Sequence, residues 1–207
     1  MFRLRTRTTT SEAHPAQGAS RRAALARTLL CGAITCAALA CVPARAPADP
    51  PDPYAQKADM LGNMAKFVQW PDAIMAANKG QIVVAVLGED DLAAAIANVL
   101  STRSVNGKPV FVRFARRPQD ARGCQIVYIA APELARATEV EDVLRGSPTL
   151  VLADADGFAS RGGMVNFSGT PPNVRFEICL VRAQAAGLKI SSRLLAIAHV
   201  VEPAATP

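Results

Sequence analysis

The sequence predicts an α/β fold: a single compact domain in which helices flank a mixed sheet of about six strands, with a C-terminal antiparallel hairpin followed by a helix. Two observations indicate the sheet. Apolar segments alternate with helix-like segments through residues 81–153, which is the order of parallel strands joined by crossover helices. Two strand-like segments then flank a Gly-Thr-Pro-Pro turn at residues 169–172, a composition typical of a tight turn.

The elements are expected in the following order. An amphipathic helix at residues 54–69 shows apolar side chains every three or four positions, and Pro71 ends it because the residue before a proline avoids helical geometry. Asp90 is placed to cap the helix that follows the first buried strand. The remaining prediction is strands at 81–87, 108–114, 124–130, 149–153, 163–168 and 173–181, and helices at 91–100, 132–144 (opened by Pro132) and 191–201.

Residues 1–48 have the parts of a cleaved signal peptide. Arg21, Arg22 and Arg27 precede an uncharged stretch at residues 28–44, and Ala46-Pro47-Ala48 fits the A-x-A cleavage pattern. We expect cleavage after Ala48, by either the Sec or the twin-arginine route. The expected location of residues 49–207 is therefore the periplasm.

The sequence disfavours two other fates of the leader. A retained anchor needs about 20 strongly apolar residues, and the stretch at 28–44 is shorter and dominated by Ala, Thr and Cys. A lipid-anchored start at Cys41 is disfavoured because the preceding Ala38-Leu39-Ala40 is a poor lipoprotein signal.

Removal of the leader changes the charge and the cysteine count. The chain has 23 basic and 17 acidic residues, but seven of the basic residues and one acidic residue lie within residues 1–48, so sixteen of each remain. A neutral domain lacks the basic surface that nucleic-acid binding requires. Of five cysteines, only Cys124 and Cys179 remain, and an oxidising compartment allows either a disulfide between them or two free thiols.

Residues that carry chemistry are scarce in the predicted domain. His199 is its one histidine, and no hydrolase, zinc-protease or P-loop motif occurs. Residues 87–90 (Leu-Gly-Glu-Asp) follow the first strand. A phosphate-binding loop would present free backbone N–H groups at this point, whereas this loop carries two acidic side chains. Residues 154–157 resemble the start of a calcium-binding loop. The twelve-residue loop would need an acidic ligand at position 165, but that residue is Val165. We therefore expect no enzyme, no catalytic residue, no metal site and no cofactor.

Three segments together resemble the YfiR-like family of periplasmic proteins. They are residues 63–71 (Asn-Met-Ala-Lys-Phe-Val-Gln-Trp-Pro), residues 156–167 (Asp-Gly-Phe-Ala-Ser-Arg-Gly-Gly-Met-Val-Asn-Phe), and residues 174–178 (Val-Arg-Phe-Glu-Ile) continuing to Gly-Leu-Lys-Ile-Ser-Ser-Arg-Leu-Leu at 187–195. The third is the most specific, and the resemblance extends over residues 54–201. It implies a periplasmic α/β domain without known catalysis.

The resemblance also implies a function. Relatives bind the periplasmic region of an inner-membrane diguanylate cyclase and repress it, which lowers cyclic-di-GMP and biofilm formation. An outer-membrane lipoprotein can sequester the repressor. By this analogy we expect partner binding through Phe158, Met164, Phe167, Arg175 and Glu177, with a homodimer left open. The disulfides of the family are not matched in full, so redox control by that scheme is not expected.

A function of another class remains open. The domain could bind a small ligand and act as a sensor together with a transporter or a histidine kinase, and an uncharacterised enzyme is a third and weaker alternative.

Overall fold

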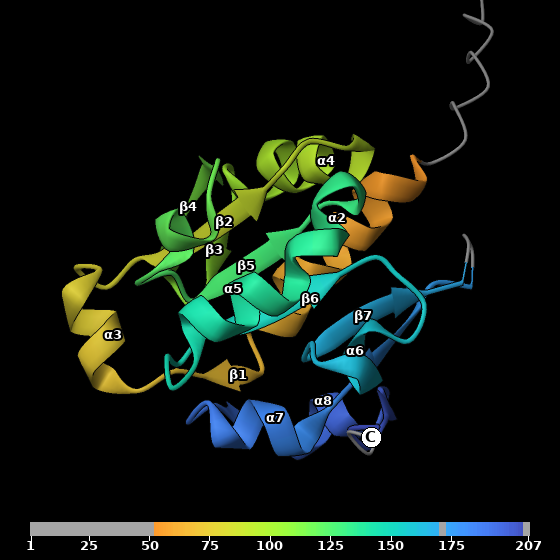
Figure 1. Ribbon diagram of the computed structural model, residues 1–207. Helices are drawn as coiled ribbons and strands as arrows, with labels where there is room; N and C mark the ends of the chain where they lie inside the picture. The colour runs from red at the N-terminus through yellow and green to blue at the C-terminus, as the bar shows by residue number, and fades with distance from the viewer. Residues whose placement is uncertain (1–51, 170–172, 205–207) are drawn as a thin grey trace, which may run out of the picture. The chain divides into compact units, whose positions relative to one another are not determined.

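The computed structural model describes residues 52–169 and 173–204 (Figure 1), which lie in one compact unit, Pro50–Pro207. The predicted signal peptide lies outside the described residues. An eight-stranded sheet has the order β10-β8-β7-β6-β5-β2-β4-β3, and β1 and β9 form a separate pair. The strands are β1 (Val68–Gln69), β2 (Ile82–Leu87), β3 (Ser104–Val105), β4 (Lys108–Ala115), β5 (Ile126–Ile129), β6 (Leu150–Ala153), β7 (Val165–Ser168), β8 (Arg175–Ile178), β9 (Lys189–Ile190) and β10 (His199–Val200).

The sheet is mixed, as predicted. Strands β4, β2, β5, β6 and β7 run parallel, and β8 pairs antiparallel with β7, with Phe167 opposite Phe176 and Asn166 opposite Glu177. The predicted hairpin is therefore confirmed. From β2 the chain moves outward to β4 and then returns to the other side of β2 to form β5. Such a reversal of direction is the place where open α/β sheets bind their ligands.

Helices cover both faces of the sheet (Figure 1). One face buries the apolar side chains of α2 (Pro53–Ala65) and α4 (Asp91–Leu100) against strand residues such as Val84, Ile126 and Phe167. On the other face, η1 (Pro118–Ala121), α5 (Ala137–Leu144) and α6 (Phe158–Arg161) pack against the strand residues that alternate with those of the first face. The continuous apolar pattern of β2 is thus explained by burial on two sides.

The first predicted helix is shorter than expected. Helix α2 ends at Ala65, and Val68–Gln69 forms β1, which pairs with β9. The prediction that Pro71 ends this helix is therefore wrong: Pro71 is instead the N-cap residue of a helix that the sequence reading missed, α3 (Asp72–Ala77). Between them, Trp70 is 8% exposed and its indole nitrogen donates to the Gln125 carbonyl at 3.1 Å.

Three predicted elements in the later chain also need correction. Pro132 opens a 3₁₀ helix, η2 (Ala131–Arg136), before α5 begins. The second hairpin strand ends at Ile178, and α7 (Leu180–Ala185) follows it. The predicted helix at 191–201 is only α8 (Ser192–Leu195), because His199 and Val200 pair with β8 as β10. Backbone pairing at an open sheet edge outweighs the weak helical preference there. None of the helices in the described ranges is both long enough and apolar enough to span a membrane.

Candidate functional site

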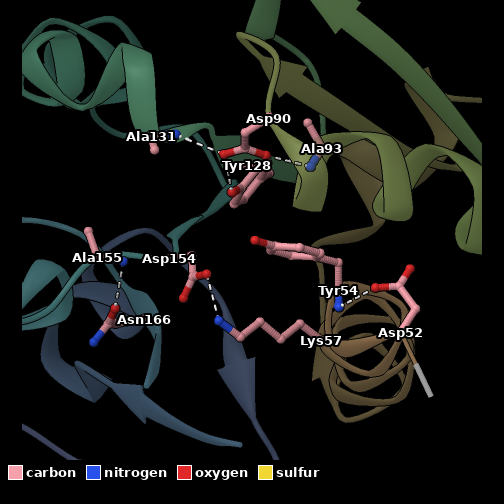
Figure 2. Close-up of polar contacts among 10 residues, drawn as sticks. All are labelled: Asp52, Tyr54, Lys57, Asp90, Ala93, Tyr128, Ala131, Asp154, Ala155 and Asn166. Carbon is pink, nitrogen blue, oxygen red and sulfur yellow. Dashed lines mark hydrogen bonds and ion pairs between the residues drawn. The ribbon is translucent and has the colours of Figure 1, made fainter. Parts of the chain in front are cut away.

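Polar side chains gather where the parallel strands end, and this group is the candidate site (Figure 2). Asp90 follows β2, Tyr128 lies in β5, Asp154 follows β6, and Lys57 reaches the same place from α2. Carboxyl ends of parallel strands meet at one edge of a sheet, which explains why residues distant in sequence come together. We call these four residues the edge cluster.

Asp90 joins the two strands at the reversal point. One oxygen of its carboxylate, Oδ1, accepts from the Ala93 amide at 2.6 Å, which confirms Asp90 as the cap of α4. Its Oδ2 accepts from the Tyr128 hydroxyl at 2.8 Å and from the Ala131 amide at 2.9 Å. The carboxylate therefore occupies the helix terminus that a phosphate would otherwise use.

The Tyr128 hydroxyl keeps its proton and donates it in the hydrogen bond to Asp90. Its side chain is 1% exposed, and burial together with the neighbouring Asp90 carboxylate raises the pKa of the Tyr128 phenol. A phenol in such a setting keeps its proton, because ionisation would place a second negative charge beside Asp90. The pair is thus a fixed hydrogen bond between a neutral phenol and a carboxylate.

Lys57 and Asp154 form a part-buried ion pair across the cluster. The Lys57 Nζ donates to Asp154 Oδ2 at 2.6 Å, and the side chains are 11% and 25% exposed. Figure 2 shows the ring of Tyr54 extending from α2 into the space between this pair and the Asp90–Tyr128 pair. Tyr54 and Lys57 are three residues apart on one helix, so they share a face.

A buried amide connects the edge cluster to the hairpin. Asn166, 1% exposed, accepts from the Ala155 amide at 3.2 Å through Oδ1 and donates to Glu177 Oε2 at 2.9 Å through Nδ2. The loop that begins with Asp154 is thereby bound to β7 and β8. The position of Glu177 is consequently set by the same loop that supplies Asp154.

The arrangement is suited to recognition and to rigid positioning. Each charged group of the edge cluster already has a hydrogen-bonding partner within the domain. Within residues 52–169 and 173–204, no three His, Cys, Asp or Glu side chains are grouped so that they could hold a metal ion.

The predicted contact residues do not form one surface. Phe158 is 5% exposed and Phe167 is 1% exposed, and they fill core clusters on opposite faces of the sheet. This corrects our expectation that they face a partner, because Phe158 in α6 and Phe167 in β7 each fill one of the two cores. Met164 is half-buried and borders a cavity of about 210 Å³. Arg175 is exposed, and Glu177 is half-buried beside Asn166.

The two cysteines are free thiols, each 0% exposed. Cys124 precedes β5 and Cys179 follows β8, three strand positions away in the sheet. At about 4.8 Å per strand the separation is about 14 Å, well above the 7 Å that a disulfide tolerates between Cα atoms. The disulfide that the sequence left open is therefore excluded. Burial also raises the pKa of the Cys124 thiol, with Arg113 opposing it in part.

Sequence reasoning missed most of the edge cluster. Asp154 was considered only within the rejected calcium-loop pattern at residues 154–157, and Asn166 only as a strand residue. Lys57 carried a usable signal: it lies on the apolar side of the first predicted helix, where a charged residue needs a partner. Nothing local indicates that the partner is Asp154, 97 positions later.

A family model described as YfiR/HmsC-like matches residues 54–199. No curated protein matches the chain. Among solved structures, the chain is similar to the ABC domain in complex with L-Trp from Streptococcus pneumonia, with 12% identity and a TM-score of 0.45. The match covers 67% of this chain and 62% of that chain, so it spans less than two thirds of the solved one.

Proposed function

Because the chain belongs to the YfiR/HmsC-like family, we propose that it is a periplasmic regulatory protein that represses an inner-membrane diguanylate cyclase by protein–protein contact. Family membership supports a role in the regulation of cyclic-di-GMP signalling in general. The observation that carries the proposal is the extent of the match, residues 54–199, which includes both the edge cluster and the hairpin. An outer-membrane lipoprotein is a second partner consistent with this role.

The proposed contact with the cyclase centres on β8. Arg175 and Glu177 alternate with the buried Phe176 and Ile178, so both charged side chains lie on the side of the strand away from that core. Asn166 holds the Glu177 carboxylate, so the acidic group is oriented before a partner arrives. Preorganised charges of both signs favour a specific partner over a nonspecific one.

The test compares charge reversals at two exposed arginines. Arg175→Glu changes the proposed contact, whereas Arg122→Glu changes an exposed loop before β5 and serves as the matched control. In cells, Arg175→Glu should raise cyclic-di-GMP as much as deletion of the gene does, with Arg122→Glu unchanged. Mass spectrometry of the nucleotide provides the measurement, and chemical unfolding confirms that both variants fold.

Glu177 needs a milder substitution. A lysine there would leave the buried Asn166 amide without its acceptor and destabilise the domain. Glu177→Gln keeps an acceptor for Asn166 and removes only the charge. A cyclic-di-GMP level that stays unchanged in Arg175→Glu, Glu177→Gln and the deletion strain would contradict the proposal.

A small-ligand sensor is the second candidate, and the edge cluster favours it. Lys57, Asp154 and Tyr54 lie at the carboxyl ends of strands beside the reversal point, where α/β folds place ligands. A thermal-shift screen of amino acids and nucleotides tests this candidate, because a ligand that binds the folded state raises its stability. A shift that disappears in Asp154→Asn would support the sensor over the repressor.

A further inference from the structure

A cavity of about 210 Å³ lies at the opposite ends of the strands from the edge cluster. Val151 near the start of β6 and Met164 just before β7 line this cavity, together with residues of α5 and α7 (Figure 1). The edge cluster, in contrast, takes Asp154 from just after the last residue of β6. The cavity is therefore a separate place on the domain, and neither proposed function uses it.

Two side chains of opposite charge line the cavity. The Nη1 atom of Arg182 on α7 lies 3.8 Å from Oε2 of Glu141 on α5, which is longer than a hydrogen bond. Within residues 52–169 and 173–204, the Nε atom of Arg182 is buried and has no hydrogen-bond partner. Burial raises the pKa of the Glu141 carboxyl, and the Arg182 charge offsets this only in part. Both groups therefore retain hydrogen-bonding capacity that a ligand can use.

The backbone leaves space for the Glu141 carboxylate at the cavity wall. Gly162 has a φ of +150°, a conformation that residues with a side chain rarely adopt. A Cβ atom at this position would lie 2.5 Å from both carboxylate oxygens of Glu141. The carboxylate thus occupies the space that a side chain at position 162 would fill, and any larger residue there would displace it.

Most other side chains that line the cavity are aliphatic. They include Leu144, Val151, Met164 and Ala185, and no aromatic ring is present among the described residues of the lining. A ligand that fits has one polar end and an aliphatic body. A sugar is disfavoured, because its hydroxyls point in several directions and those that face the aliphatic wall would lose water without gaining a partner.

We propose that this cavity binds a small neutral molecule with a primary carboxamide at one end and an aliphatic group at the other. The N–H and C=O groups of a primary amide lie side by side on one edge. The NH₂ group can therefore donate to Glu141 while the oxygen accepts from Arg182. A secondary amide is trans and points its N–H and C=O in opposite directions, so it cannot reach both residues. The site does not depend on the proposed repressor function.

Charged ligands fit the pair less well than a neutral amide. A carboxylate attracted by Arg182 would be repelled by Glu141, and an ammonium attracted by Glu141 would be repelled by Arg182. An amino-acid zwitterion matches both signs. It would, however, bring two full charges into a place where burial already disfavours the charge of Glu141.

An NMR titration of the purified protein with isovaleramide tests the ligand class. The backbone amide signals of Gly146, Gly162 and Ala186, which line the cavity, should shift and saturate. A roughly millimolar Kd is expected for so small a probe. Isovalerate, isopentylamine and valine carry a similar branched chain with one or two charges, and each should bind about tenfold more weakly. The absence of a saturable shift with isovaleramide would overturn the proposal, as would equal or tighter binding of a charged analogue.

Variants of the charged pair test which residues hold the probe. Arg182→Met keeps the aliphatic stem and removes the guanidinium, so isovaleramide should bind about tenfold more weakly. Arg193→Met, at an exposed position on α8 outside the cavity, is the matched control and should bind as wild type does.

Glu141→Gln provides a second variant in case Arg182→Met does not fold. It keeps an acceptor oxygen but loses the charge, so binding should weaken severalfold, because hydrogen bonds to a charged acceptor are about twice as strong as neutral ones. Unchanged binding in a folded Arg182→Met or in Glu141→Gln would show that the probe is not held by this pair, and would overturn the proposal. Neither measurement involves a cyclase, so the outcome is independent of the repressor function.

Discussion

The side-chain amide of Asn166 on β7 donates a 2.9 Å hydrogen bond to the carboxylate of Glu177 on β8, directly across the antiparallel pair. Its carbonyl oxygen accepts from Ala155 in the loop after β6. One buried amide thus fixes both an acidic side chain and the loop that carries Asp154. The orientation of the Asn166 side chain follows from its partners, because only its NH₂ group can donate to a carboxylate.

Asn166→Asp should make stability strongly dependent on pH. At neutral pH the new carboxylate faces Glu177 and cannot donate, so we expect a loss of about 2–3 kcal/mol. Repulsion raises the proton affinity of the pair in the folded state, so the loss appears as pH rises above about 4 and is recovered on acidification. Urea unfolding between about pH 4 and pH 7 provides the measurement. Asn166→Leu is the control, and a pH profile equal to that of Asn166→Asp would contradict the prediction.

Removal of one partner of the Lys57–Asp154 pair should cost more than removal of both. Asp154→Ala leaves the Lys57 ammonium, 11% exposed, without its counter-ion, and we expect a loss of about 3 kcal/mol. Lys57→Met combined with Asp154→Ala should recover most of that loss. Thermal or urea unfolding of the two single variants and the double variant gives the coupling energy. Simple additivity would show that the two groups do not interact.

Glu141→Gln should stabilise the domain at neutral pH. Burial raises the pKa of the Glu141 carboxyl, and Arg182 at 3.8 Å offsets this only in part. The folded state therefore holds the proton more tightly than the unfolded chain. That contribution is fully present below the unfolded pKa and is lost as pH rises through the folded one. The stability gap between the variant and wild type should widen from about pH 4 to pH 7; a gap that narrows would refute the assignment.

The two cysteines of the domain should be unreactive in the native state. Cys124 and Cys179 are fully buried, and the raised pKa of Cys124 further reduces its thiolate fraction. Ellman's reagent should therefore detect no thiol before denaturation and two per chain in guanidinium, because Cys31, Cys36 and Cys41 belong to the predicted leader. A count of five would show that the leader is retained, and a count of none would indicate a disulfide.

The fold was predictable wherever burial leaves a local pattern. The apolar run of β2 ends at Gly88, and Asp90 begins α4, so both boundaries can be inferred from adjacent residues. Strands β1, β9 and β10 have two residues each and exist because a partner strand lies beside them. Such short strands leave no periodicity that a sequence could display.

The site was less predictable than the fold. Glu177 could be selected because it alternates with apolar residues on a clear strand, but its restraint by Asn166 depends on the hairpin register. The aromatic residues Phe158 and Phe167 were misjudged because composition alone does not distinguish a core aromatic from one that binds a partner. The edge cluster depends on strand order, which no local signal encodes.

The two sides of the main sheet end differently, and this difference limits how far association can proceed. At one side β8 is followed by β10, a strand of two residues, whereas β4 at the other side has a bare stretch beyond β3. Short terminal strands resist further pairing. Among the described strands, the part of β4 beyond Val110 is therefore the one long stretch of sheet edge left uncovered, so main-chain association with another chain can start only there.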